Sequence, residues 1–240
     1  MTKGRARQEL AEWLDRPEND PAALAANLRD LRRLNRLLGW TAGVVDELER
    51  LTRAAGLRRV TVLDVATGSA DVPLAMARWA ARQGVEARVL ASDVSGQVLA
   101  EARALTAGEP AIDLLRHEGT RIPLAAGAVD VATCCLALHH FGPEAAVALL
   151  RELGRVARRG VIVCDLERSA AAYWAAVAAG LLASSPLTRH DGPVSVRRAY
   201  TRQEAEALAR AAGLDGLRAR QRFPFRWVLS GLREGDGRWR

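Results

Sequence analysis

Residues 1–57 carry the hydrophobic spacing of helices. Leucines recur every three or four positions over residues 24–38 and arginines lie between them, so one side of this segment is apolar and the other is charged. Asp20-Pro21 is a typical helix start, and a second helix is expected over residues 44–55. The pattern therefore predicts an N-terminal helical cap over residues 1–57.

From residue 58 onward, short β-rich runs alternate with helical ones. The expected strands are residues 60–65, 87–91, 112–116, 129–136 and 161–164, and the expected helices are residues 72–81, 96–105 and 143–156. Strands that alternate with helices form βαβ units, in which neighbouring strands run parallel and helices cover both faces of the sheet. This part of the chain therefore predicts a doubly wound α/β fold.

The last part of the chain completes the sheet with a different connection. A capping-box pattern opens a helix over residues 204–212. Two closing β-rich runs, residues 217–222 and 225–229, are too close together for a crossover helix and suit a hairpin. We expect a seven-stranded, mostly parallel sheet whose last two strands are antiparallel, within one domain over residues 58–240.

The composition adds a basic charge to this picture. Hydrophobic residues make up 49% of the chain, which is typical of a globular protein. The net charge is +7 and Lys3 is the only lysine, so arginine carries nearly all of the positive charge. This charge suits a nucleic-acid or acidic-membrane partner, or it solvates helix faces. No long run of basic residues is present, which favours solvated helix faces.

Cysteine usage and apolar stretches bear on the compartment. Cys134, Cys135 and Cys164 lie in apolar runs without C-x-x-C spacing, so neither a disulfide framework nor a zinc site is indicated. Reduced thiols are typical of the cytosol, and the charged start of the chain lacks the apolar stretch of a signal peptide. Residues 170–183 are too few for a transmembrane helix of roughly 20 residues. We expect a cytoplasmic protein without a metal site.

The segment from Asp64 to Asp71 joins a predicted strand to a predicted helix through a turn of small residues. Ligands of open α/β sheets bind at such carboxyl ends of strands, and small residues let the backbone approach a ligand closely. A dinucleotide-binding loop needs three glycines to hold a pyrophosphate, whereas this loop has only Gly68. The Asp64 carboxylate would repel phosphate and attract an ammonium group, so the loop favours a cationic amino-acid cofactor.

This segment resembles motif I of the class I S-adenosylmethionine-dependent methyltransferases, hh[D/E]hGxGxG. Gly68 matches the central glycine, whereas Ala66 and Ala70 stand at the outer glycine positions, as alanine does at the first position in the ubiquinone- and menaquinone-biosynthesis type. The resemblance implies a Rossmann-like fold and S-adenosyl-L-methionine as the cofactor. It also implies that Asp64, Ala66, Thr67 and Gly68 lie against that cofactor.

Further stretches resemble the same family, in the right order and spacing over residues 57–232. The second predicted strand ends in Asp93-Val94, about where the family binds the ribose hydroxyls of the cofactor through an acidic side chain. The resemblance therefore implies that Asp93 and Val94 bind the cofactor. A helix N-cap is the alternative role for Asp93.

Two more matches concern the adenine and the methionine arm. Residues 117–124 resemble the family stretch G-D-A-x-x-L-P-F, which implies that Glu118 holds the adenine amino group and that the backbone N–H of Gly119 meets the ring. Residues 129–141 resemble the fourth strand of the family and the helix that follows it. Leu136 is then expected to face the methionine arm of the cofactor.

Methyl transfer is an in-line displacement from a sulfonium, and a phenol or enol acceptor must also lose a proton. His190 is the first candidate for the base, because it forms a His-Asp pair with Asp191 in an expected polar turn over residues 188–193, within the loop-like segment 186–193. Many family members build a lid over the acceptor from the insertion that corresponds to residues 166–199. An ordinary loop with an Asp-Gly turn is the alternative.

Two other positions are candidates for the proton step. His140 and its neighbour His139 follow the fourth strand, where many small-molecule members of the family carry histidines. For each histidine there are two interpretations: it takes a proton from the acceptor, or it makes a structural hydrogen bond at the start of a helix. Asp165 ends the fifth strand and is a second-choice acid or base, because strand ends point at the site of an α/β sheet. An ion pair with Arg168 is the alternative for Asp165.

Taken together, these residues favour O- or C-methylation of a small aromatic or lipophilic acceptor. The basic charge suggests an RNA methyltransferase as an alternative, although the chain lacks an N/D-P-P-Y/F motif. A non-catalytic S-adenosylmethionine-binding module is a third interpretation, because alanines replace two motif glycines. We expect a monomer or homodimer that binds no nucleic acid, with peripheral membrane contact left open.

Overall fold

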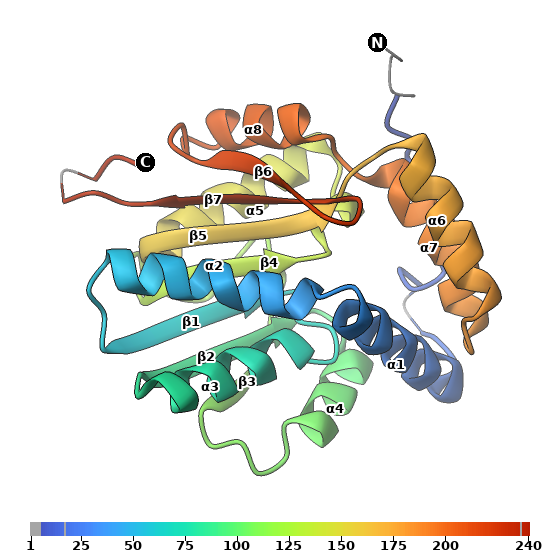
Figure 1. Ribbon diagram of the computed structural model, residues 1–240, viewed down its shortest axis with the longest axis horizontal. Helices are drawn as coiled ribbons and strands as arrows, with labels where there is room; N and C mark the ends of the chain where they lie inside the picture. The colour runs from blue at the N-terminus through green and yellow to red at the C-terminus, as the bar shows by residue number, and fades with distance from the viewer. Residues whose placement is uncertain (1–5, 17, 236) are drawn as a thin grey trace.

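Seven strands form one sheet in this computed structural model, which describes residues 6–16, 18–235 and 237–240 (Figure 1). The strands are β1 (Arg59–Val65), β2 (Glu86–Asp93), β3 (Ile112–Arg116), β4 (Val129–Cys135), β5 (Ala157–Leu166), β6 (Arg218–Arg222) and β7 (Arg226–Leu232). Their order across the sheet is β3-β2-β1-β4-β5-β7-β6. Strands β1 to β5 run parallel, and β7 is antiparallel to both β5 and β6. The predicted mostly parallel sheet with a terminal hairpin is confirmed.

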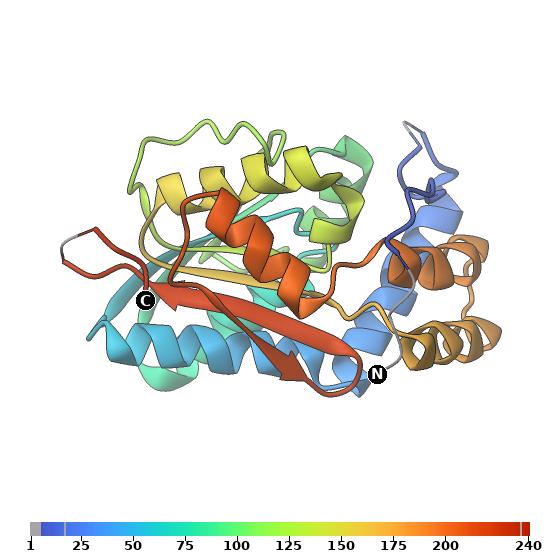
Figure 2. The same ribbon diagram turned by 90° about the horizontal axis from the view of Figure 1, so that it is seen from above.

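Helices pack on both faces of this sheet and at one of its ends. They are α1 (Pro21–Leu37), α2 (Trp40–Ala54), α3 (Asp71–Gln83), α4 (Gly96–Leu105), α5 (Pro143–Val156), α6 (Ala170–Leu181), α7 (Pro186–Arg198) and α8 (Arg202–Ala211), with a 3-10 helix, η1, at Leu138–His140. Helices α2 and α3 lie on one face and α5 and α8 on the other, as the view from above shows (Figure 2). Each face has its own cluster of buried aliphatic side chains. Within the described residues, no helix has the length and hydrophobicity to cross a membrane.

Local capping chemistry sets several helix boundaries. The Asp20 carboxylate accepts a hydrogen bond from the backbone N–H of Ala23 at 2.8 Å and so caps α1, as predicted. Gly39 adopts a left-handed conformation with φ 65, which separates α1 from α2. Helix α2 therefore begins at Trp40, earlier than the predicted start at residue 44. The predicted capping box at Thr201 is also present.

The prediction of a loop over residues 186–193 is wrong, because these residues form the first turns of α7. Pro186 lies in the first turn of the helix, where its missing N–H needs no intrahelical partner. Pro193 lies in the interior and removes one helical hydrogen bond. The helix nevertheless continues, because Leu187 and Val196 are buried on it. Tertiary packing overrides the local turn signal here.

Helices α1, α6 and α7 lie together at the end of the sheet where the parallel strands finish (Figure 1). Asp30 of α1 joins α1 to the start of α7. Its carboxylate accepts hydrogen bonds from the backbone N–H groups of Ser184 and Ser185, each at 2.9 Å, and from Thr188 Oγ1 at 3.1 Å. Asn27 Nδ2 also donates to Thr188 Oγ1, at 3.0 Å. These bonds hold α1 and α7 against each other above the strand ends.

Candidate active site

The loop after β1 has the backbone conformation of a glycine-rich loop, although two of its key positions are alanine. Ala66, Gly68 and Ala70 all adopt the left-handed conformation, with φ 57, 56 and 60. The backbone N–H of Thr67 donates to the Ser92 carbonyl at 2.8 Å, which ties the loop to β2. Glycine adopts this conformation readily, whereas alanine is strained in it. The loop shape that the sequence pattern implies is therefore kept at some cost in backbone strain.

Asp64 lies at the end of β1, buried beneath this loop. Its carboxylate accepts hydrogen bonds from Thr67 Oγ1 at 2.7 Å and from Thr133 Oγ1 at 2.6 Å. Burial raises the pKa of Asp64 to about 6, although the two threonine hydrogen bonds act in the opposite direction. A neighbouring cation, such as an ammonium group, would favour the ionised form of this carboxylate.

Asp93 is the last residue of β2, and its carboxylate lies against the loop after β1. It accepts hydrogen bonds from the backbone N–H of Gly68 at 3.2 Å and of Ser95 at 3.0 Å. Burial raises the pKa of Asp93. The N-cap of α4 is Ser95, whose Oγ accepts a hydrogen bond from Val98 N. The alternative role of Asp93 as that N-cap is therefore wrong.

A cavity of about 1040 Å³ lies between this loop and helices α1, α6 and α7. This volume is at the upper end of the range for small-molecule sites, and it has room for a cofactor and a small acceptor. Most of the predicted cofactor residues line it, namely Asp64, Ala66, Thr67, Gly68, Asp93, Val94 and Leu136. The wall that α1 and α6 contribute is largely aliphatic, with Leu24, Leu28, Leu31, Leu34, Ala172, Ala175, Ala176 and Ala179.

His139, in η1 after β4, is held by a carboxylate at the end of β5. Its Nδ1 lies 2.7 Å from Asp165 Oδ1, and its backbone N–H donates to Asp165 Oδ2 at 2.9 Å. Asp165 is fully buried and also accepts a hydrogen bond from Leu166 N at 2.7 Å. A carboxylate acceptor at Nδ1 places the ring proton there and leaves Nε2 as a proton acceptor. His139 lines the cavity, whereas Asp165 does not.

Asp165 does not pair with Arg168, which forms an ion pair with Glu204 at 2.7 Å instead. The alternative that the sequence left open for Asp165 is therefore wrong. The two strand-end candidates, His139 and Asp165, were each found in the sequence but not as a pair. They meet because β4 and β5 are neighbours in the sheet.

A comparison with known protein families identifies the kind of domain that carries this site. Residues 62–160, from β1 to β5, match the family described as a methyltransferase domain. The chain therefore contains a methyltransferase domain. No curated protein sequence matches the chain significantly.

Solved structures of other methyltransferases share the fold. A SAM-dependent methyltransferase from Aquifex aeolicus is 20% identical with a TM-score of 0.62, over 90% of this chain and 99% of that chain. Magnesium protoporphyrin IX methyltransferase from Synechocystis PCC 6803, solved with bound SAM, is 17% identical with a TM-score of 0.53, over 85% and 84% of the two chains. The putative methyltransferase in complex with the Trm112 activator from Haloferax volcanii is 17% identical with a TM-score of 0.59, over 90% and 98%. At these identities the likeness shows the fold alone, and with the family match the cofactor is S-adenosylmethionine.

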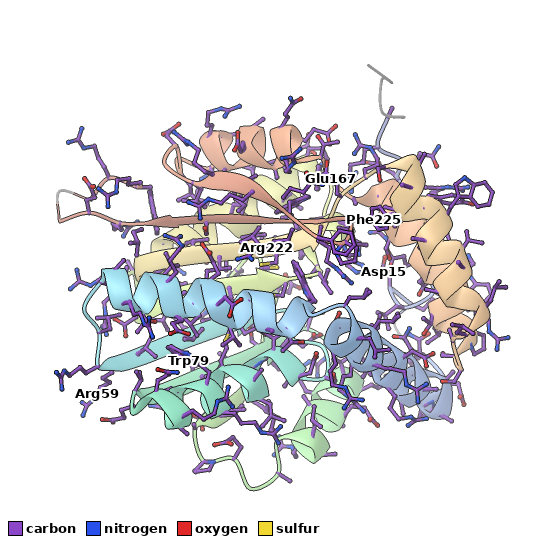
Figure 3. The ribbon with its side chains drawn as sticks, viewed as in Figure 1. Asp15, Arg59, Trp79, Glu167, Arg222 and Phe225 are labelled. Atoms are coloured by element: carbon purple, nitrogen blue, oxygen red, sulfur yellow. The ribbon has the colours of Figure 1, made fainter. Side chains whose placement is uncertain are left out.

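The N-terminal segment of the methyltransferase, ahead of α1, adds residues to this site that sequence reasoning missed. His140 Nδ1 lies 2.7 Å from Asp15 Oδ1, and His140 Nε2 lies 3.7 Å from Glu12 Oε2. Arg198 at the end of α7 forms an ion pair with Asp15. Figure 3 shows Asp15 near the end of the sheet that faces α6 and α7. The leucine spacing that predicted a helical cap starts only at residue 24, so nothing in the sequence indicated that the acids ahead of it reach the histidines after β4.

Glu12 is the most unusual of these side chains, because it is only 3% exposed and its Oε1 makes no hydrogen bond. Burial raises its pKa to about 7, although His140 and Arg198 lower it. Its carboxylate and the Nε2 atoms of His139 and His140 lie within 4.8 Å of one another. Two imidazoles and a carboxylate can hold a divalent transition metal, particularly when carboxylates orient the imidazoles. This trio was not predictable from the sequence, because Glu12 is far from the two histidines in the chain.

His190 lies in α7 and does not line the cavity. Its ring stacks on Trp13 with the centroids 4.1 Å apart, and its Nδ1 lies 2.6 Å from Asp191 Oδ1. The Asp191 carboxylate also accepts hydrogen bonds from the backbone N–H groups of Trp13 and Leu14, at 2.8 and 2.9 Å. The expected His-Asp pair exists, and it anchors the N-terminal segment to α7; Asp191 lines the cavity, whereas His190 does not.

Glu118 and Gly119, the two predicted adenine contacts, do not line the cavity. The Glu118 side chain is exposed. Gly119 lies in a tightly packed position, because a Cβ atom there would lie 3.0 Å from Val65 Cγ1 and 3.1 Å from Leu149 Cδ1. Nothing in their positions supports a side-chain contact between Glu118 and adenine.

Proposed function

We propose that this chain transfers a methyl group from S-adenosylmethionine to an oxygen or carbon of a small aromatic or lipophilic acceptor. The observation that carries the proposal is the buried His139–Asp165 pair, whose imidazole lines the same cavity as the cofactor loop. Catalysis at a phenol or enol needs a base within reach of the acceptor and a third group that orients the base. The aliphatic wall from α1 and α6 suits a flat, apolar acceptor.

The cofactor is proposed to lie over the loop after β1, in the crevice at the carboxyl ends of β1 and β2. Asp93 accepts hydrogen bonds from the ribose hydroxyls, while Asp64 attracts the ammonium group of the methionine part. Ala66, Thr67 and Gly68 let the backbone approach it, with Val94 beside the adenosine and Leu136 beside the methionine arm. What supports this arrangement is that all of these residues line one cavity.

In the proposed reaction, the His139 Nε2 atom takes the proton from the acceptor. A bond forms between the acceptor oxygen or carbon and the methyl carbon as the bond from that carbon to the sulfonium sulfur breaks. The electron pair of the broken bond stays on sulfur, so the product of the cofactor is S-adenosylhomocysteine, an uncharged thioether. Asp165 stabilises the imidazolium that results, and the nearby Glu12 offers a second carboxylate. Asp165 thus has a positioning role, and His139 takes the place of His190 and His140 as the proposed base.

Residues 1–57 are proposed to act as a cap and residues 166–199 as a lid, attached to the domain over residues 58–240. The support is that α1, α6 and α7 provide one side of the cavity and are bonded to one another through Asp30. The cavity under these helices fits a small molecule better than an RNA strand. We also propose a cytoplasmic location, because the three cysteines are free thiols.

The test is an assay of S-adenosylhomocysteine release with a panel of phenols, polyketide-like enols and quinone precursors. The quinone precursors are included because the loop after β1 resembles that of the quinone-biosynthesis methyltransferases. Total RNA serves as the competing substrate. We expect turnover on members of the panel and none on RNA. Methylation of RNA alone would replace the proposal with the RNA alternative that the +7 charge suggested. Cofactor binding without turnover on either would indicate a non-catalytic module.

A further inference from the structure

Arg226 is a buried cation in the wall of the cavity. It is the first residue of β7 and pairs in register with Leu166 at the end of β5, next to the turn that carries Phe225. Figure 3 shows Phe225 near the end of the sheet that faces α6 and α7. Arg226 is only 7% exposed, and it lines the cavity together with Phe225.

This arginine forms no ion pair with a described residue, although the charge of Asp165 raises its pKa. Its Nε is buried without a hydrogen-bond partner, and no described carboxylate forms an ion pair with its guanidinium. The nearby Asp165 already accepts hydrogen bonds from His139 and Leu166. Burial lowers the pKa of Arg226 to about 10, which still leaves it charged at neutral pH. A buried charge without a partner destabilises a fold, so this one is expected to serve a ligand.

A second unpaired donor lies beside it. The guanidinium carbon of Arg226 is 5.0 Å from the ring centroid of Trp40, the first residue of α2. Trp40 is 3% exposed, lines the same cavity, and its indole Nε1 is also buried without a hydrogen-bond partner. The other unpaired polar atoms of cavity-lining residues, Glu12 Oε1 and Asn27 Oδ1, are acceptors. The neighbourhood of Arg226 and Trp40 therefore calls for an anionic acceptor group.

We propose that Arg226 and Trp40 bind a carboxylate inside the cavity. A guanidinium matches the planar, two-oxygen shape of a carboxylate, and the indole N–H adds a further donor. The carboxylate has two possible sources: the methionine part of the cofactor, or an acceptor that is an aromatic acid. The inference rests on the proposed use of the cavity for cofactor and acceptor. The experiment below distinguishes a failure of the carboxylate site from a failure of the proposed function.

The probes are S-adenosylhomocysteine and its decarboxylated analogue, with 2-hydroxybenzoate and phenol as the acceptor pair. Their binding is measured by calorimetry on the wild type and on Arg226→Met, the acceptor pair in the presence of saturating S-adenosylhomocysteine. If the cofactor supplies the carboxylate, Arg226→Met weakens S-adenosylhomocysteine about 10- to 100-fold and leaves the decarboxylated analogue unchanged. If the acceptor supplies it, the same loss appears for 2-hydroxybenzoate and not for phenol.

Controls keep the result interpretable. Arg220→Met, an exposed position on the neighbouring strand β6, should leave all four affinities unchanged. Trp40→Phe keeps an aromatic ring and removes the N–H, so it should lower the affinity for the same carboxylate by up to about 10-fold, even if Arg226→Met folds poorly. Arg226→Met is also expected to raise the melting temperature of the ligand-free protein, because an unpaired buried charge is removed.

Two results would overturn the inference. One is an unchanged affinity for both carboxylates in Arg226→Met and Trp40→Phe. The other is an equal loss for the carboxylates and their carboxylate-free partners, which would mean that Arg226 only shapes the cavity. If the wild type does not bind S-adenosylhomocysteine at all, the proposed function fails instead, before Arg226 is tested.

Discussion

His139→Gln should remove the proposed base while keeping most of the local structure. Glutamine retains the backbone N–H that donates to Asp165, and it can place an amide near the position of Nδ1. Asp165 then keeps its hydrogen bonds from the backbone of residue 139 and from Leu166, so the free energy of unfolding should fall by only about 1–3 kcal/mol. The loss of general base catalysis lowers turnover by about 10²–10⁴, which corresponds to about 2.7–5.5 kcal/mol in the activation free energy.

The assay is single-turnover methylation of two phenols by the wild type and by His139→Gln, at saturating S-adenosylmethionine. Phenol itself keeps its proton near neutral pH, as a tyrosine side chain with a pKa of about 10 does. A nitrophenol that is already ionised at the assay pH needs no base. The rate loss should therefore be large for phenol and small for the nitrophenol. His140→Gln is the matched control, because its Nδ1 is held by Asp15 in the same way.

An equal loss of rate on both phenols would contradict the role of His139 as the base, because His139 would then position the acceptor without deprotonating it. No loss on either phenol would move the base to His140 or Glu12. A general folding defect is recognised separately, because it would also lower the affinity for S-adenosylhomocysteine.

Four further predictions follow from the site. Asp93→Ala should weaken S-adenosylhomocysteine binding by about 1.5–3 kcal/mol for each lost hydrogen bond, measured by calorimetry, and unchanged affinity would mean that Asp93 does not hold the ribose. Burial raises the pKa of Asp64 from 3.8 to about 6, so between these two pH values the folded protein holds a proton that the unfolded chain has lost. Asp64 therefore stabilises the ligand-free fold fully below the lower value, and this contribution is lost as the pH rises through about 6. Binding of the ammonium group needs the ionised form, so S-adenosylhomocysteine affinity should be lower at about pH 5 than at about pH 7.5, and Asp64→Asn should reduce that pH dependence. Ala66→Gly should raise the melting temperature more than Ala70→Gly: relief of the left-handed alanine is worth roughly 1–2 kcal/mol at both positions, but the fully buried Ala70 also loses a methyl contact worth about 0.8 kcal/mol. Chelator treatment should leave turnover unchanged if His139 is a free base, whereas a loss that Zn²⁺ or Mn²⁺ restores would assign Glu12, His139 and His140 to a metal.

The sheet and the cofactor loop were predictable because their signals are local. The β1 loop, from Asp64 to Ala70, carries its pattern within a few consecutive residues, and the positions of the outer glycines are still left-handed. The short connection before Arg226 likewise left room only for a hairpin. In each case neighbouring residues in the chain decide the conformation.

The proton-transfer cluster was not predictable, because it is assembled from distant parts of the chain. Glu12 and Asp15 reach the histidines from a segment without hydrophobic periodicity, and only the folded chain brings them together. His190 was favoured because a His-Asp pair is adjacent in sequence, yet Asp191 uses its carboxylate to hold the backbone of residues 13 and 14. A pair of side chains says little about its role until the groups that compete for its hydrogen bonds are known.

The bonds between α1, α7 and the N-terminal segment also bear on how molecules enter and leave the enzyme. Asp30 joins α1 to the start of α7, and Asp191 joins α7 to residues 13 and 14. These three parts are therefore hydrogen-bonded to one another. The chain connects them to the rest of the domain at Gly39, at residues 167–169 and at residues 199–201, and Arg198 also donates hydrogen bonds to the carbonyls of His139 and His140. Acceptor entry past these helices then requires several connections to move together, which is a collective motion on the microsecond-to-millisecond scale rather than the faster motion of a single loop. In such an enzyme, the exit of the methylated product is a natural bottleneck for turnover.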